Sequence, residues 1–98
     1  ERTYVDTSVK LAPDVALLPG VVLRGACDLG QGAEVGPDCT LVDTTVGEGT
    51  EIRHSVCIDA VIGAGARVGP FAYLGPGSIV EDAETVPPFR VLPPTATE

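Results

Sequence analysis

The 98-residue sequence has little of what many folds and binding sites require. It contains no tryptophan or methionine, two phenylalanines, two tyrosines, and only six lysines and arginines against 14 acidic residues. No stretch free of glycine and proline carries apolar residues at helical spacing over three turns, which argues against long helices. No apolar run approaches the roughly 20 residues that a membrane span needs. Because the net charge is −8, we expect no nucleic-acid partner and no membrane partner.

Cysteine and histidine are also too few for several kinds of site. The three cysteines are an odd number and include no CxxC pair, so they indicate neither a disulfide framework nor a zinc motif. His54 is the only histidine, which excludes a zinc site of three imidazoles, and we expect no bound metal. No signal peptide opens the sequence, and a reducing compartment suits these cysteines, so a cytoplasmic location is predicted.

What the sequence does have is a branched aliphatic residue at every sixth position. The register slips twice, by one residue after Leu41 and by two after Ile58. The members are Val5, Leu11, Leu17, Leu23, Leu29, Val35, Leu41, Val46, Ile52, Ile58, Ile62, Val68, Leu74, Val80, Val86 and Leu92. A period of six suits neither an α-helix nor a single strand. It indicates a solenoid in which each unit is a short strand followed by a turn.

Two further positions share this period. The residue after the aliphatic is often glycine, at Gly30, Gly36, Gly47, Gly63, Gly69 and Gly75. The residue two before the aliphatic is small or β-branched, at Val9, Val15, Val21, Cys27, Ala33, Cys39, Thr50, Val56, Ala66, Ala72 and Ser78. Three units would form a triangular coil of about 18 residues, with the aliphatics inside and the small residues where the walls crowd. Glycine suits the turns, where a positive φ or a close backbone approach is needed.

These repeats predict an all-β fold, a single-stranded left-handed parallel β-helix of about five triangular coils. Residues 1–98 would form one domain, in which 86–98 are a proline-rich C-terminal closure and tail. Pro87 and Pro88, together with Pro93 and Pro94, would stop further strand pairing there, because proline has no N–H to donate.

The repeat pattern resembles that of the hexapeptide-repeat acyltransferases. The segments "LAPDVALLPG", "VGPDCTLVDTTVGEGTEI" and "IGAGARVGPFAYLGPG" are similar to the first coils of one acetyltransferase domain in that family. That domain belongs to the bifunctional bacterial enzymes that act as glucosamine-1-phosphate acetyltransferase and N-acetylglucosamine-1-phosphate uridyltransferase. The resemblance implies a homotrimer of solenoids packed side by side, with active sites in the clefts between subunits.

The sequence departs from this family at the residues that carry its chemistry. The family phrase "GPFxxLRPG" has an arginine that helps to hold the acyl acceptor, and Gly75 stands at that position here. The catalytic histidine of the family, with a lysine, a tyrosine and asparagines near the acetyl-CoA site, belongs to later coils that this sequence does not include. The resemblance therefore implies a shortened solenoid, either natural or truncated.

Candidate catalytic groups are few. His54 could act as a general base for acetyl transfer, but its neighbours Glu51 and Arg53 favour a solvated turn with a structural role. Cys27 and Cys39 are predicted to be small core residues on different walls, without a disulfide between them. Cys57 lies where the register slips, and there core packing is favoured while an exposed thiol stays a possibility.

Two functions remain open. One is a trimerising module without its own complete active site, in which at least one of Phe71, Tyr73 and Phe89 lies at the subunit interface. The other is an acetyl-CoA-dependent N-acetyltransferase acting on an amino sugar, similar to glucosamine-1-phosphate, in cell-envelope precursor synthesis. We favour the module, which needs no cofactor, because coenzyme A phosphates prefer basic clefts. The basic residues here are scattered, at Arg2, Lys10, Arg24, Arg53, Arg67 and Arg90.

Overall fold

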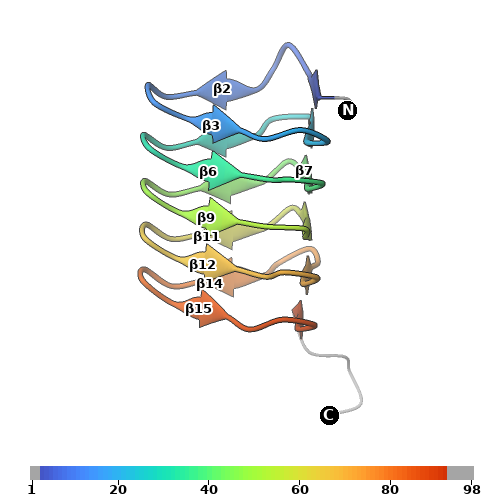
Figure 1. The fold of residues 1–98 in the computed structure, drawn as a ribbon, viewed down its shortest axis with the longest axis vertical. Coiled ribbons are helices and arrows are strands. Elements are labelled where there is room, and N and C mark those ends of the chain that lie inside the picture. The colour runs from blue at the N-terminus through green and yellow to red at the C-terminus, as the bar shows by residue number, and fades with distance from the viewer. Residues whose placement is uncertain (1–2, 93–98) are drawn as a thin grey trace.

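The chain winds into a triangular prism of parallel strands, in a computed structural model that describes residues 3–92 (Figure 1). Wall A has six strands: β1 (Tyr4–Val5), β4 (Val22–Arg24), β7 (Thr40–Val42), β10 (Val56–Ile58), β13 (Tyr73–Leu74) and β16 (Val91–Leu92). Wall B has β2 (Lys10–Leu11), β5 (Asp28–Leu29), β8 (Thr45–Val46), β11 (Val61–Ile62) and β14 (Ile79–Val80). Wall C has β3 (Ala16–Leu17), β6 (Glu34–Val35), β9 (Glu51–Ile52), β12 (Arg67–Val68) and β15 (Thr85–Val86).

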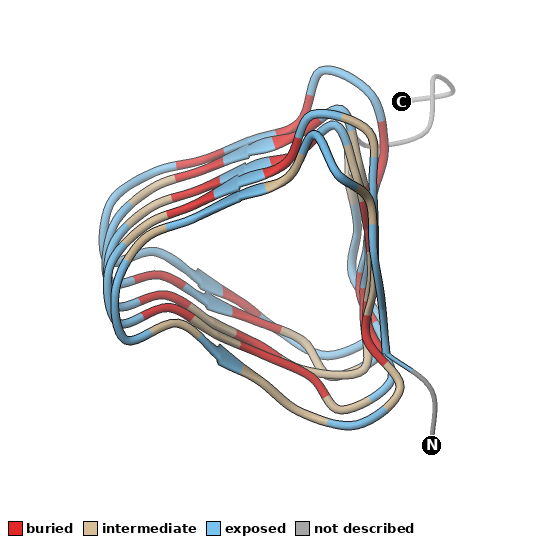
Figure 2. Cartoon of the chain, turned by 90° about the horizontal axis from the view of Figure 1, so that it is seen from above, coloured by how far each residue is buried: buried red, intermediate tan, exposed pale blue. Residues whose placement is uncertain are grey.

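Each inner strand pairs with the strand one coil above and the strand one coil below, and the strand at either end of a wall has one such partner. Within residues 3–92, no strand pairs with a strand of its own coil. Seen from above, the three walls enclose a triangular interior (Figure 2). This is the predicted left-handed parallel β-helix of about five coils, and the prediction of the fold class is confirmed.

The interior is filled by the residues that the six-residue period selects. Leu23, Leu29 and Leu41 are completely buried, and the core continues through Ile52, Ile62, Val68, Leu74, Val80 and Val86. Hydroxyl side chains occupy some of the small positions, where a buried polar group needs a partner. The Thr50 hydroxyl donates to the Gly63 carbonyl oxygen at 2.6 Å, and the Thr44 hydroxyl donates to that of Cys57 at 3.1 Å.

The predicted register was wrong around Cys57. The structure buries Cys57 completely, in line with Leu41 above and Leu74 below, while Ile58 is only partly buried and Val56 is exposed. The chain takes five-residue steps from Leu41 to Val46, from Ile52 to Cys57 and from Cys57 to Ile62. A cysteine thus occupies an interior position that is aliphatic in most other units. A six-residue count from Ile52 leads to Ile58 and therefore misses Cys57.

The glycines after the aliphatics serve close packing between stacked turns. A Cβ on Gly47 would lie 2.5 Å from the backbone nitrogen of Ala64, and one on Gly30 would lie 2.8 Å from that of Glu48. Neither glycine has a positive φ. In these turns between walls B and C, the residue with a left-handed backbone comes two positions later, as at Gly49, where φ is +69°.

The two ends of the prism differ from its middle. Val5 and Leu11 belong to the interior series but are exposed, because no coil lies above them among residues 3–92. At the other end, Val86 of the predicted closure ends β15, and residues 87–92 form the last corner and β16. Because β16 pairs with β13, strand pairing continues past Pro87 and Pro88, contrary to the prediction. Residues 93–98 lie outside the described residues. No helix within residues 3–92 has the length and apolar character to cross a membrane.

Candidate functional site

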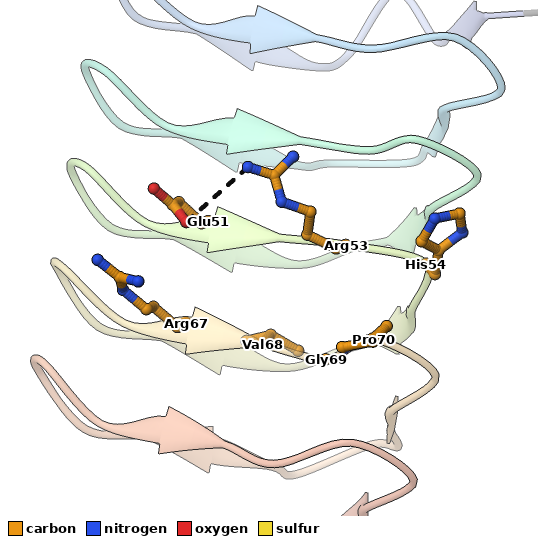
Figure 3. A pocket seen from close by; sticks show the side chains of 7 residues that line it. All are labelled: Glu51, Arg53, His54, Arg67, Val68, Gly69 and Pro70. Carbon is orange, nitrogen blue, oxygen red and sulfur yellow. Dashed lines mark ion pairs between the residues drawn. The ribbon is translucent and has the colours of Figure 1, made fainter.

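The outer face of wall C holds an open hollow of about 300 Å³ near its corner with wall A. It is lined by Glu51, Arg53, His54, Arg67, Val68, Gly69 and Pro70. Figure 3 shows Arg53 and Arg67 on successive coils, with His54 at the corner beyond Arg53. The hollow therefore brings two guanidinium groups and the only imidazole of the chain to one region of the surface.

Arg53 is held in place by the coil above it. Its guanidinium donates to the Gly36 carbonyl oxygen at 3.2 Å and lies 3.5 Å from a Glu34 carboxylate oxygen. It also lies 3.9 Å from a carboxylate oxygen of Glu51. Because these groups are more than a third exposed, water weakens the ion pairs, which orient the arginine more than they stabilise the fold.

His54 stands in a column of corner residues. Its backbone is left-handed, with φ +43°, and its ring stacks on Phe71 with centroids 5.5 Å apart. Phe71 in turn stacks on Phe89 at 5.6 Å, and His54 Nδ1 lies 3.8 Å from an Asp38 carboxylate oxygen above it. The sequence placed His54 in a surface turn, and the structure adds that aromatic stacking holds the ring.

The cysteines take no part in this hollow. Cys27, Cys39 and Cys57 are free and buried, so the core placement of the first two and the missing disulfide are confirmed. For Cys57, where core packing and an exposed thiol were both open, the structure shows the buried position. Burial raises the pKa of all three thiols, which keeps them in the protonated, unreactive form.

The described residues hold no group of three or more His, Cys, Asp or Glu side chains that could bind a metal ion. Gly75 directly follows β13 on wall A, where it is buried beside the Tyr73 ring, and its N–H donates to the Leu92 carbonyl oxygen. It therefore lies away from the hollow on wall C.

Reasoning from the sequence did not foresee the hollow. It treated Arg53 and Arg67 as scattered, although both fall on wall C in neighbouring coils. The register of β9 and β12, which places Arg67 beside Glu51, is the signal that could have found them. That register depends on the five-residue steps, which the six-residue count did not locate correctly.

Comparison with known proteins places the chain among acetyltransferase sequences. No family model matches it. The bifunctional protein GlmU of Micrococcus luteus is 46% identical over 87 residues, which is 89% of this chain and 18% of GlmU. GlmU of Rhodococcus jostii is 49% identical over 78 residues, which is 80% of this chain and 16% of that protein. The chain thus spans less than a fifth of these relatives.

Solved structures share the fold at low sequence identity. The acetyltransferase domain of PglB from Neisseria gonorrhoeae, in complex with acetyl coenzyme A, aligns with 87% of this chain and 51% of its own. The TM-score is 0.69 at 16% identity. The GDP-perosamine N-acetyltransferase of Caulobacter crescentus gives a TM-score of 0.58 at 19% identity, over 87% of this chain and 52% of its own.

The six-residue repeat, the triangular coils and the similarity to GlmU agree with one another. The resemblance stated from the sequence is thereby confirmed. This chain has the fold of the hexapeptide-repeat acyltransferases, and it is similar to part of the acetyltransferase region of the bifunctional GlmU proteins.

Proposed function

We propose that this chain is a trimerising β-helix module of the acetyltransferase type, without a complete active site of its own. It would act as one domain, 1–98, and in the cytoplasm. The observation that carries the proposal is the state of His54, the one imidazole available as a base. Its ring is stacked on Phe71 and its Nδ1 lies 3.8 Å from an Asp38 carboxylate oxygen, and within residues 3–92 no acid–base partner at hydrogen-bond distance completes a catalytic pair.

A requirement for acetyl-CoA does not follow from this arrangement. Coenzyme A carries several phosphates, and the basic residues in the described hollow are Arg53 and Arg67. Arg53 is already directed at Glu34 and Glu51. A module that requires no cofactor agrees with this charge distribution, and the net charge of −8 opposes polyanion binding in general.

The alternative is an acetyl-CoA-dependent N-acetyltransferase acting on an amino sugar, such as a glucosamine-1-phosphate-like acceptor in cell-envelope precursor synthesis. One observation favours it: the hollow gathers His54, Arg53 and Arg67, which could meet a sugar phosphate. In that case His54 would serve as the general base, and acetyl-CoA would bind between subunits.

Two measurements on the purified chain separate these functions. Light scattering gives the mass in solution, and calorimetry gives the affinity for acetyl-CoA. We expect three times the 10.0 kDa chain mass and no heat of acetyl-CoA binding. Micromolar binding that His54→Gln or Arg67→Gln weakens would favour the enzyme, and a monomer would contradict the trimerising module.

A further inference from the structure

Negative charge is concentrated on one side of the prism. Within residues 3–92, every acidic side chain except Glu34, Asp38 and Glu51 lies on wall B or at one of its two corners. These three exceptions are also the acidic residues that form ion pairs, with Arg53 and His54. The carboxylates around wall B form no ion pair with a described basic residue, and they hold most of the net charge of −8.

The column of outward side chains on wall B changes from polar to apolar along the prism. It runs from Lys10 through Asp28 and Thr45 to Val61 and Ile79, each paired in register with the next. The last two side chains are 51% and 65% exposed, and they lie side by side on β11 and β14. They form a small apolar patch, and burying it against a partner would be favourable.

Carboxylates border this patch on both sides. Asp59 directly follows β10 at the corner between walls A and B, and Glu81 and Asp82 directly follow β14 at the corner between walls B and C. All three are exposed. Lys10, the one described basic residue on wall B, lies on β2, at the opposite end of the wall from β14. The patch therefore combines an apolar centre with an anionic border.

From these observations we infer that the outer face of wall B is a docking surface for a basic amphipathic helix of another protein. Apolar side chains of such a helix would cover Val61 and Ile79, and its lysines or arginines would face the carboxylates on either side. A second copy of this chain does not fit, because two wall B faces would bring like charges together. The inference goes beyond the proposed function, since it requires neither a trimer nor acetyl-CoA.

Wall B offers a partner its side chains and not its backbone groups. Strands β5, β8 and β11 are paired along both edges, so no further strand can be added between them. Successive coils lie about 4.8 Å apart, which is close to the rise of about 5.4 Å for one helical turn. A helix along the prism axis would therefore present one turn to each coil, and roughly 16 residues would span the stack.

The small size of the patch indicates a transient contact. Two aliphatic side chains expose far less than the roughly 800 Å² that each partner buries in a stable interface. Attraction between exposed charges would then supply much of the affinity, and salt screens that attraction. We therefore expect binding that weakens as the salt concentration rises.

The test uses the full chain and a fluorescent peptide, with binding measured by anisotropy. The peptide has roughly 16 residues of leucine and lysine, with the leucines on one face of the helix. It should bind with micromolar affinity at low salt. A peptide of the same composition, with the leucines spread around the helix, should bind about tenfold more weakly or worse.

Two pairs of substitutions locate the contact by charge. Asp59→Asn with Asp82→Asn removes two wall B carboxylates and should weaken binding by about tenfold. Glu34→Gln with Glu51→Gln removes the same charge from wall C and is the matched control, which should change the affinity by less than about twofold. Equal weakening by the two pairs would show a general attraction to an acidic protein and would overturn the inference.

Val61→Ser with Ile79→Ser tests the apolar centre and should weaken binding by about tenfold or more. Nuclear magnetic resonance of the wild type gives a second measurement if a variant does not fold. The peptide should shift the amide signals of β11 and β14 and leave those of β9 and β12, on wall C, in place. An unchanged affinity in the serine variant, shifts centred on wall C, or the absence of peptide binding would each overturn the docking surface.

Discussion

The first coil and the second coil carry the same repeat but bury it to different extents. Val5 and Leu11 of the first coil are 40% and 45% exposed, whereas Leu23 and Leu29, directly below them, are completely buried. The side chains are of the same kind and point into the same interior. The difference is that the second coil has a neighbour on both sides and the first has one on only one side.

This comparison shows that the repeat alone does not determine how much each coil stabilises the fold. The aliphatic directs each unit inward, but burial comes from the coils stacked above and below, as expected for a solenoid in which each repeat contacts only its neighbours. The inner coils should therefore contribute most of the free energy of unfolding, and the first coil should open first. The following predictions test that difference, from the largest expected effect to the smallest.

The largest effect is expected from removing an inner aliphatic. Leu41→Ala leaves a cavity that coils on both sides enclose, so it should lower the free energy of unfolding by about 2–5 kcal/mol. Leu11→Ala removes the same atoms from a half-open layer and should cost less than about 1 kcal/mol. Urea unfolding measures both. Equal losses would mean that the first coil is as well covered as the third.

A smaller effect is expected from glycines at one corner. Gly47→Ala would force a Cβ to within 2.5 Å of the Ala64 backbone, so the coils must separate locally, at about 1–3 kcal/mol. A Cβ on Gly49 would meet no atom within 4 Å, so Gly49→Ala should cost only the strain of an alanine at positive φ, roughly 1 kcal/mol. Thermal unfolding of the two variants gives the order. A larger loss for Gly49→Ala would show that backbone conformation, and not the contact between coils, requires glycine here.

The sequence predicted the walls, most of the interior series and the number of coils. The six-residue period recurs so often that a few units of a different length do not hide it. It misplaced Cys57 because three units have five residues, and one uses sulfur where the others use a branched aliphatic. The unequal unit lengths also prevented the sequence from predicting the column of corner residues that contains His54. Asp38, His54, Phe71 and Phe89 are separated by 16, 17 and 18 residues, and a constant period of 18 would place Ala72, not Phe71, below His54.

The buried thiols provide a pH test of the central coils. Burial raises the pKa values of Cys27, Cys39 and Cys57 above the ordinary value of about 8.5 that they regain on unfolding. A raised pKa means that stability is complete below the unfolded value and is lost as the pH rises above it. We expect the urea midpoint to fall above about pH 8.5 and iodoacetamide to modify only unfolded chains.

Cys57→Ala is the control for this test, since it removes the thiol in line with Leu41 and Leu74. The variant should be less stable at neutral pH and should lose less stability as the pH rises. Rapid labelling of Cys57 in the folded wild type would contradict the buried position.

The smallest effect is expected at the first corner, where solvent reaches every group. The Tyr4 hydroxyl and the Gly25 N–H, which donates to the Asp6 carboxylate at 2.7 Å, hold the pKa of Asp6 below its usual value. A lowered pKa adds stability above the unfolded value of about 3.9, and that stability is lost as the pH falls through the folded value. Asp6→Asn should therefore flatten the acid limb of the stability curve slightly. Because the first coil opens before the others, hydrogen exchange at the amides of Tyr4 and Gly25 should report this loss more clearly than global unfolding does. Identical exchange in wild type and Asp6→Asn at pH 7 would mean that the carboxylate does not tie the first coil to the second.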